Sequence, residues 1–381
     1  AVRKQRHVVL VDQRGTGGSN ALECTPPEDA QDTAPDADAI AELARGCATD
    51  VADRADPRFY TTTDAIADLD AVREAIGAQT LNLVGGSYGT RVAQQYAARF
   101  PERVRSIVLD GVAPNDLVVG GEFAHTFEDA IRSQSRQCQQ LPACKARFPK
   151  DAHAQLESLV ARLGDAPVAV EYRDPASGES RTGTVNADTV TGLAFMFSYM
   201  PQTASLLPLV LDEADQGRYA PLMSLAQLMG RSTAGSMARG MQWSVICAED
   251  ADRLEVDAAA ADTLLGEDVA RMFFAGCAGW PHGSRPDGFT DPLRSDAPVL
   301  LLSGELDPVT PPRYGERVLE HLPNGRHLVL RGQGHGTLGL GCMPRLLGQF
   351  MESADAKALD ASCLDSLSYV PPFTSFNGWE P

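Results

Sequence analysis

The sequence has no long hydrophobic run and is poor in basic residues. No stretch of about 18 or more uninterrupted apolar residues occurs, and a helix needs about that length to cross a bilayer. Lys and Arg number 33 against 51 Asp and Glu, which gives a formal net charge of −18. A negative field of this kind opposes binding to nucleic-acid phosphates and to anionic lipid. The sequence therefore predicts neither a transmembrane segment nor a nucleic-acid partner.

Zinc-binding and secretion-signal patterns are also missing. No CxxC pair occurs, and Cys138 and Cys144 are too widely spaced, without histidines close by, for a zinc site. The first residues, AVRKQRHVVLVDQRG, have a basic start but too short an apolar run for a secretion signal. They are typical of the interior of a domain.

Eight cysteines are present, and they fall into neighbouring pairs. Many pairings are possible in principle, and eight buried free thiols remain an alternative. Disulfides would indicate an oxidising compartment, the periplasm or the outside of the cell. Proximity in the sequence predicts the pairs Cys24–Cys47, Cys138–Cys144, Cys247–Cys277 and Cys342–Cys363.

The order of the predicted elements indicates an α/β protein with a large insertion. With 381 residues, 43% of them hydrophobic, the chain can bury one large core and an inserted unit. Strands alternate with helices up to residue 112, and this alternation predicts a mainly parallel sheet. The predicted strands are HVVLV, LNLV, RSIVLDGV, VLLLSGEL and RHLVL, with helices at TTTDAIADLDAVREAIG, RVAQQYAARF, around 314–322 and from about 343.

Between residues 113 and 292 the pattern changes to mostly helical segments, interrupted by a predicted hairpin, VAVEYRDPASGESRTGTVN. We therefore expect a first core part at 1–112, a helical cap at 113–292 and a second core part at 293–381. The stretch 21–60 is polar, and the residues from about Ser366 are expected to form an irregular tail.

The central chemical motif is Gly85-Gly86-Ser87-Tyr88-Gly89, a GxSxG sequence directly after a predicted strand and before a helix. A serine at such a turn takes a strained backbone conformation that projects its hydroxyl above the sheet, and the glycines let strand and helix approach closely. This context predicts that Ser87 is a nucleophile in an α/β-hydrolase fold.

A serine hydroxyl needs a neighbouring base, and this fold supplies acid and histidine in the order Ser, Asp, His. His335 lies in the glycine-flanked loop GQGHG after the last predicted strand, and Asp307 follows the strand VLLLSGEL. We expect Asp307 to orient the imidazole of His335. Asp110, at the end of RSIVLD, is the rival acid. Asp12 and Arg14 are interpreted as a pair that braces loops.

Oxyanion stabilisation in this fold uses two backbone N–H donors. The residue after the nucleophile, Tyr88, is predicted to provide one of them. No HGG-like motif for the second occurs, and the chain begins where the fourth strand of the fold is expected. We therefore expect the first strands and the loop with the second donor to be missing from this sequence, and to precede it in a longer precursor.

The blocks DQRGTGGS, VGGSYGTRVAQQYAARFPERVRSIVLDGV and LLLSGELDPVTPP resemble the prolyl and tripeptidyl aminopeptidase family. The segments SVICAEDAD and GCAGWP are more similar to its tripeptidyl branch. The resemblance implies an α/β-hydrolase core with a helical cap and an exopeptidase acting on peptides with a free N-terminus. It carries the roles of Ser87, Asp307 and His335 over by position. Because an ammonium group must be recognised by ionised carboxylates, Glu249 and Asp250 in the cap are candidates for substrate binding, with solvated surface charges as the alternative.

Two other functions fit the same residues. An esterase or lipase-like hydrolase would use the same triad, because the triad does not determine the leaving group. A non-catalytic binding protein that retains the serine turn is the third reading. None of the three implies a metal ion or an organic cofactor.

Overall fold

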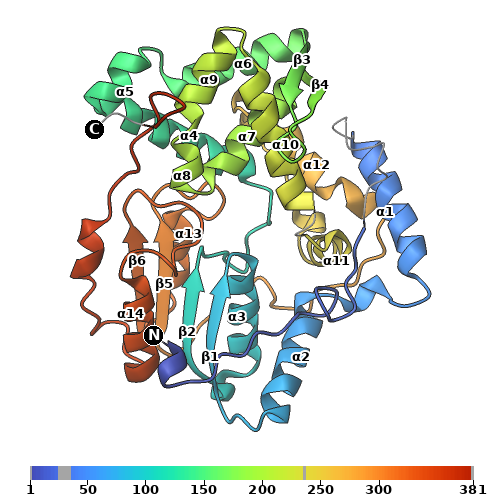
Figure 1. Cartoon of the computed structure of the whole chain (residues 1–381). Coiled ribbons are helices and arrows are strands. Elements are labelled where there is room, and N and C mark those ends of the chain that lie inside the picture. Colours follow the sequence, from blue (N-terminus) through green and yellow to red (C-terminus); the bar gives the residue numbers. More distant parts are fainter. Residues whose placement is uncertain (1, 25–35, 235–236, 379–381) are drawn as a thin grey trace.

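A four-stranded parallel sheet forms the centre of the molecule (Figure 1). The computed structural model describes residues 2–24, 36–234 and 237–378. The strand order is β1-β2-β5-β6, and every neighbouring pair is parallel. The strands are β1 Leu81–Gly86, β2 Val104–Asp110, β5 Val299–Gly304 and β6 Gly325–Leu330. All four therefore end at one edge of the sheet, the edge that faces the cap in Figure 1.

Helices cover both faces of this sheet, because alternate residues of the strands are buried on opposite sides. One face of β2, with Ile107 and Leu109, packs with residues of α3 and α13. The other face, with Val108, packs against α14. The core helices are α2 Thr62–Ala75, α3 Tyr88–Arg99, α13 Pro312–Leu319 and α14 Met343–Ser353. These elements confirm the predicted alternation of strands and helices.

The predicted strand at HVVLV is wrong. Residues 7–11 have no assigned strand structure, and their side chains are largely open to solvent, with Leu10 92% exposed. A strand is stable only when its backbone groups pair with a neighbour, and within the described residues no strand pairs with this segment. A short run of apolar residues is thus not sufficient to form a strand.

The cap lies over the carboxyl ends of the strands (Figure 1). Its main core is built from α4, α6, α7, α9 and α10 together with the predicted hairpin, which the structure confirms as an antiparallel pair. The cap elements are α4 Phe123–Gln140, α5 Pro142–Arg147, α6 Ala152–Asp165, β3 Val168–Arg173, β4 Ser180–Val185, α7 Ala187–Ser198, α8 Pro201–Ala204, α9 Leu207–Asp215, α10 Ala220–Ala234, α11 Arg239–Glu249 and α12 Asp268–Phe274.

A helix that the sequence did not predict, α1 Ala37–Val51, packs against this cap. Its Ala44 and Cys47 share a buried cluster with Trp243 and Cys247 of α11. Residues 37–51 thus lie with the cap, although the predicted division at 112 assigned them to the core. Part of the polar stretch 21–60, residues 25–35, lies outside the described residues.

All four predicted cysteine pairs are formed as disulfides. Cys247–Cys277 joins α11 to the short 3-10 helix Ala275–Ala278 inside the cap. Cys342–Cys363 ties the start of α14 to the C-terminal segment, which is irregular as predicted, although its last residues, 379–381, lie outside the described residues. Among the described residues, no helix has the length and hydropathy that crossing a membrane would require.

Candidate active site

Ser87 sits at the sharp turn between β1 and α3, with φ 53° and ψ −124°. A non-glycine residue with positive φ is strained and needs support from its surroundings. The backbone N–H of Ser87 donates to the carbonyl of Asp110, 2.8 Å away, and this bond holds the turn at the end of β2. A Cβ at Gly85 would lie 2.2 Å from the carbonyl oxygen of Gly89, so only glycine permits this approach of strand and helix. The conformation is the one predicted for a nucleophile at this turn.

Asp307 and His335, 28 residues apart, meet at the same edge of the sheet. Nδ1 of His335 lies 2.7 Å from Oδ2 of Asp307. The carboxylate is also held by donors from its own turn: the backbone N–H of Val309 and of Thr310 donate to Oδ1, and the Thr310 hydroxyl donates to Oδ2. Asp307 is 2% exposed. The acid and the histidine that the sequence predicted are therefore in direct contact.

The electrostatics of this pair favour an ionised carboxylate beside a basic imidazole. Burial alone would raise the pKa of Asp307, but its hydrogen bonds to His335 and to the turn lower it below its usual value. Burial lowers the pKa of His335, and the carboxylate of Asp307, with a smaller contribution from Asp110, outweighs it and raises that pKa above its usual 6.5. The ring is thereby made a stronger base.

Asp110, the rival acid, has different partners. Its Oδ2 accepts from the backbone N–H groups of Thr337 and Leu338, and its Oδ1 accepts from the Thr337 hydroxyl. These bonds hold the loop that directly follows His335. Asp110 therefore braces the histidine loop, and Asp307 is the carboxylate that touches the ring.

Ser87 and His335 lie on either side of the chain at Asp110 and Gly111. Ser87 is bonded to the carbonyl of Asp110, and a Cβ at Gly111 would lie 3.0 Å from Cε1 of His335. The ring makes its hydrogen bonds through Nδ1, and in the described part of the chain none joins its Nε2 to the Ser87 hydroxyl. Such bonds are often long in unliganded sites and tighten when substrate binds.

Two residues at this site were missed by the sequence analysis. The Thr310 hydroxyl donates to Asp307 and also lies 3.0 Å from Nδ1 of His335. Tyr199, just after α7 in the cap, accepts a hydrogen bond from the backbone N–H of His335 and packs its ring edge-on against the imidazole, 5.4 Å between centroids. An Asp followed three residues later by Thr is a turn pattern that could have indicated Thr310. No signal in the sequence pointed to Tyr199, because its contact is made across the gap between cap and core.

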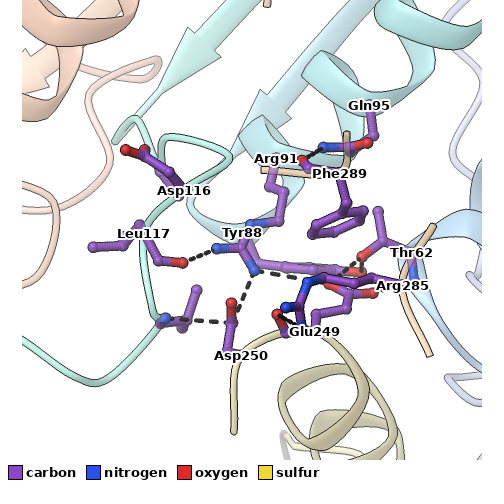
Figure 2. A network of polar contacts seen from close by, with 12 residues as sticks. Thr62, Tyr88, Arg91, Gln95, Asp116, Leu117, Glu249, Asp250, Arg285 and Phe289 are labelled. Atoms are coloured by element: carbon purple, nitrogen blue, oxygen red, sulfur yellow. Dashed lines mark hydrogen bonds and ion pairs between the residues drawn. The ribbon is translucent and has the colours of Figure 1, made fainter. Parts of the chain in front are cut away.

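Glu249 and Asp250 form part of a buried network with Arg91 of α3 (Figure 2). Nη1 of Arg91 lies 2.9 Å from Asp250 and 3.7 Å from Glu249, and all three side chains have no exposed surface. Arg253 adds a second ion pair to Asp250 at 2.6 Å. Burial raises the pKa of Glu249 to about 7, against the opposing effects of Arg91 and of two donors on Thr62. Recognition of an ammonium group by these carboxylates stays a prediction, and their present partners favour a structural role.

Replacing Arg91 by Met is expected to cost about 3–5 kcal/mol of unfolding free energy, because it leaves the buried Glu249 without its counter-charge and leaves Asp250 with Arg253 alone. Urea unfolding followed by circular dichroism measures this. Arg313→Met is the matched control: its pair with Asp129 is solvent-exposed, so a loss below about 1 kcal/mol is expected. Equal losses in the two variants would contradict the role assigned to Arg91.

The predicted brace between Asp12 and Arg14 is not formed. Arg14 instead binds Asp68 of α2 with two nitrogens, each 2.5 Å from a carboxylate oxygen. Asp12 accepts the backbone N–H of Gly18 within its own loop. Both residues still stabilise loops, but through separate partners, because α2 presents a carboxylate that the local sequence did not reveal.

Three curated relatives were compared with the chain. Serine protease Hip1 of Mycobacterium tuberculosis is 27% identical over 323 residues, which cover 79% of this chain and 61% of that protein. Tripeptidyl aminopeptidase of Streptomyces lividans is 33% identical over 112 residues, 26% of this chain and 21% of that protein. Proline iminopeptidase of Neisseria gonorrhoeae is 30% identical over 105 residues, 28% of this chain and 24% of that protein.

The chain thus spans about three fifths of the length of Hip1. The relatives confirm the resemblance to prolyl and tripeptidyl aminopeptidases that the motifs suggested. The sequence profile described as the alpha/beta hydrolase fold matches residues 1–341. The strained serine turn, the parallel sheet and this match agree, and the chain belongs to the α/β-hydrolase fold family.

Proposed function

We propose that this chain is a serine peptidase in which Ser87 is the nucleophile, His335 the general base and Asp307 the acid that orients it. The observation that carries the proposal is the 2.7 Å contact between His335 and Asp307 at the sheet edge where the serine turn also ends. Relatives named as a serine protease and as aminopeptidases support a peptide substrate.

In the proposed reaction the Ser87 hydroxyl attacks the scissile carbonyl while His335 accepts its proton through Nε2. Asp307 holds Nδ1–H and stabilises the imidazolium that forms. The backbone N–H of Tyr88, the first residue of α3, has no acceptor inside the helix and would donate to the developing oxyanion. His335 then protonates the leaving amine, and a water molecule activated by His335 releases the acyl group from Ser87.

We propose further that the enzyme is an exopeptidase that requires a free peptide N-terminus. Aminopeptidases among the relatives support this specificity, and the cap lies above the strand ends (Figure 1), where it could limit the length of a bound peptide. The four disulfides are compatible with action in the periplasm or outside the cell.

A pair of model peptides that differ only in N-terminal acetylation tests this specificity. We expect the free peptide to be hydrolysed at least about 30-fold faster in kcat/KM, because truncating one partner of a buried charge pair costs about 2 kcal/mol or more. Mass spectrometry of the products measures both the rate and the length of the released piece. A p-nitrophenyl ester, which has no N-terminus to recognise, serves as the internal control for the chemistry. Equal rates for the two peptides would refute the exopeptidase, and turnover of the ester alone would favour an esterase.

A further inference from the structure

A chain of hydrogen bonds links the residue after the nucleophile to the cap. Nε2 of Gln13 lies 3.3 Å from the hydroxyl of Tyr88, and this hydroxyl lies 2.7 Å from Oγ1 of Thr62. Oγ1 of Thr62 in turn lies 2.9 Å from Oε2 of Glu249 (Figure 2). This series of hydrogen bonds therefore joins the loop at Gln13, the helices α3 and α2 of the core, and the helix α11 of the cap.

These hydrogen bonds can run in one direction only, because each hydroxyl carries a single hydrogen. Above the pKa of Glu249, which burial raises to about 7, the carboxylate is ionised and its oxygens can only accept, so the Thr62 hydroxyl donates to Glu249. Thr62 must then accept from Tyr88, and Tyr88 accepts from the amide of Gln13, which can only donate through nitrogen. Burial and the nearby charge of Glu249 raise the pKa of Tyr88, so its phenol keeps the proton that this order requires.

Glu249 is anchored well enough to set this order. It and Thr62 are fully buried, and the backbone N–H of Thr62 donates to Oε1 of Glu249 at 2.6 Å. This N–H is at the first residue of α2, where helix amides have no internal acceptor and favour a negative charge. Arg91 fixes the carboxylate from the other side. Both oxygens of Glu249 are thus held by α2, which leaves Thr62 no freedom to turn away from Tyr88.

We propose that Thr62 and Glu249 are positioning residues: they hold the phenol of Tyr88, and through it the Tyr88 backbone N–H, in line with the oxyanion formed at Ser87. This inference rests on the proposed function. Ser87 occupies a strained conformation directly before Tyr88, so a ring that is free to shift lets the turn relax and moves the donor. Loss of a complete oxyanion donor costs about 10²–10³ in turnover, and displacement of one donor is expected to cost about tenfold.

The test is a set of variants of the purified chain, assayed at pH 8 with p-nitrophenyl acetate, together with the rate at which a fluorophosphonate labels Ser87. Tyr88→Phe and Thr62→Val are each expected to lower kcat about tenfold with KM changed less than about twofold. Glu249→Gln is expected to do the same, because its amide nitrogen cannot accept from the Thr62 hydroxyl. Thr62→Ser, which keeps the hydroxyl, is expected to restore most of the rate.

Two comparisons separate positioning from a general loss of stability. Tyr96→Phe removes a phenol from the same helix, one that is bonded to Asp70 and has no hydrogen bond to Thr62 or Glu249 among the described residues, and it is expected to keep the wild-type kcat. In the Tyr88→Phe background, Thr62→Val is expected to lower kcat by less than about twofold, because residues that act through one another are not additive. If Thr62→Val fails to fold, the kcat of Tyr88→Phe compared with that of Tyr96→Phe still tests the positioning role.

If the wild type is active and Tyr88→Phe keeps the wild-type kcat, the positioning role is overturned and the proposed function is left intact. Fully additive losses in the double variant would have the same meaning. A wild-type chain that neither turns over the ester nor takes the label would overturn both.

Discussion

Ser87→Ala is expected to lower kcat for a good peptide substrate by about a million-fold, as removal of the nucleophile does in a serine peptidase. The methyl group cannot form the acyl-enzyme, and binding and oxyanion donors alone provide only a small residual rate. Steady-state turnover of a chromogenic peptide amide measures the loss. The substitution removes only one oxygen from a partly buried residue, so the fold should be retained.

Ser303→Ala provides the matched control for this variant. Ser303 is a fully buried serine in β5 that is also paired with a histidine, 2.9 Å from Nε2 of His327. Its backbone belongs to a regular strand, and burial lowers the pKa of His327, so neither feature of an activated nucleophile is present. We expect this variant to keep activity within about tenfold, since it loses one hydrogen bond. A Ser87→Ala protein that keeps a rate close to that of the wild type would exclude Ser87 as the nucleophile.

Asp307→Asn is expected to lower kcat about 10⁴-fold while the fold is retained. An asparagine in this place cannot stabilise the imidazolium and permits the wrong tautomer of His335. The pH profile of kcat/KM gives a second readout. Asp307 raises the pKa of His335, and the neutral ring that acts as base exists above that pKa. The wild-type rate should therefore fall as the pH drops through a value above 6.5, and the residual rate of Asp307→Asn should fall at lower pH.

Asp110→Asn is the comparison that separates the two acids. Its carboxylate accepts bonds from Thr337 and Leu338 but none from the ring of His335 among the described residues, so we expect a loss of about tenfold from a loosened loop. A large loss in Asp110→Asn with a small one in Asp307→Asn would reverse the assignment of the acid.

The features that the sequence predicted correctly are those carried by short local patterns. The serine turn depends on Gly85 and Ser87 within a few residues, and the hairpin at 168–185 shows strand alternation around a turn. The start of helix α2 is indicated by Thr61 and Asp64, which form a capping box. The disulfides followed from sequence proximity, because the paired cysteines are 6 to 30 residues apart.

The features that the sequence did not reveal depend on contacts between distant segments. Arg91 reads as an ordinary polar residue of α3, and only the fold brings Asp250, 159 residues later, to its guanidinium. Tyr199 reaches His335 in the same way, from the end of α7 in the cap. The strand predicted at residues 7–11 is wrong for a related reason, since an apolar run forms a strand only when a distant segment pairs with it. Local chemistry was thus predictable, and the pairing of buried charges was not.

The most direct measurement of the central claim is to label the purified chain with a fluorophosphonate and to locate the adduct by peptide mass spectrometry. We expect one phosphonylated residue, Ser87, with labelling lost in Ser87→Ala and strongly slowed in Asp307→Asn. An adduct on another serine, or an unlabelled chain that still hydrolyses peptides, would contradict it.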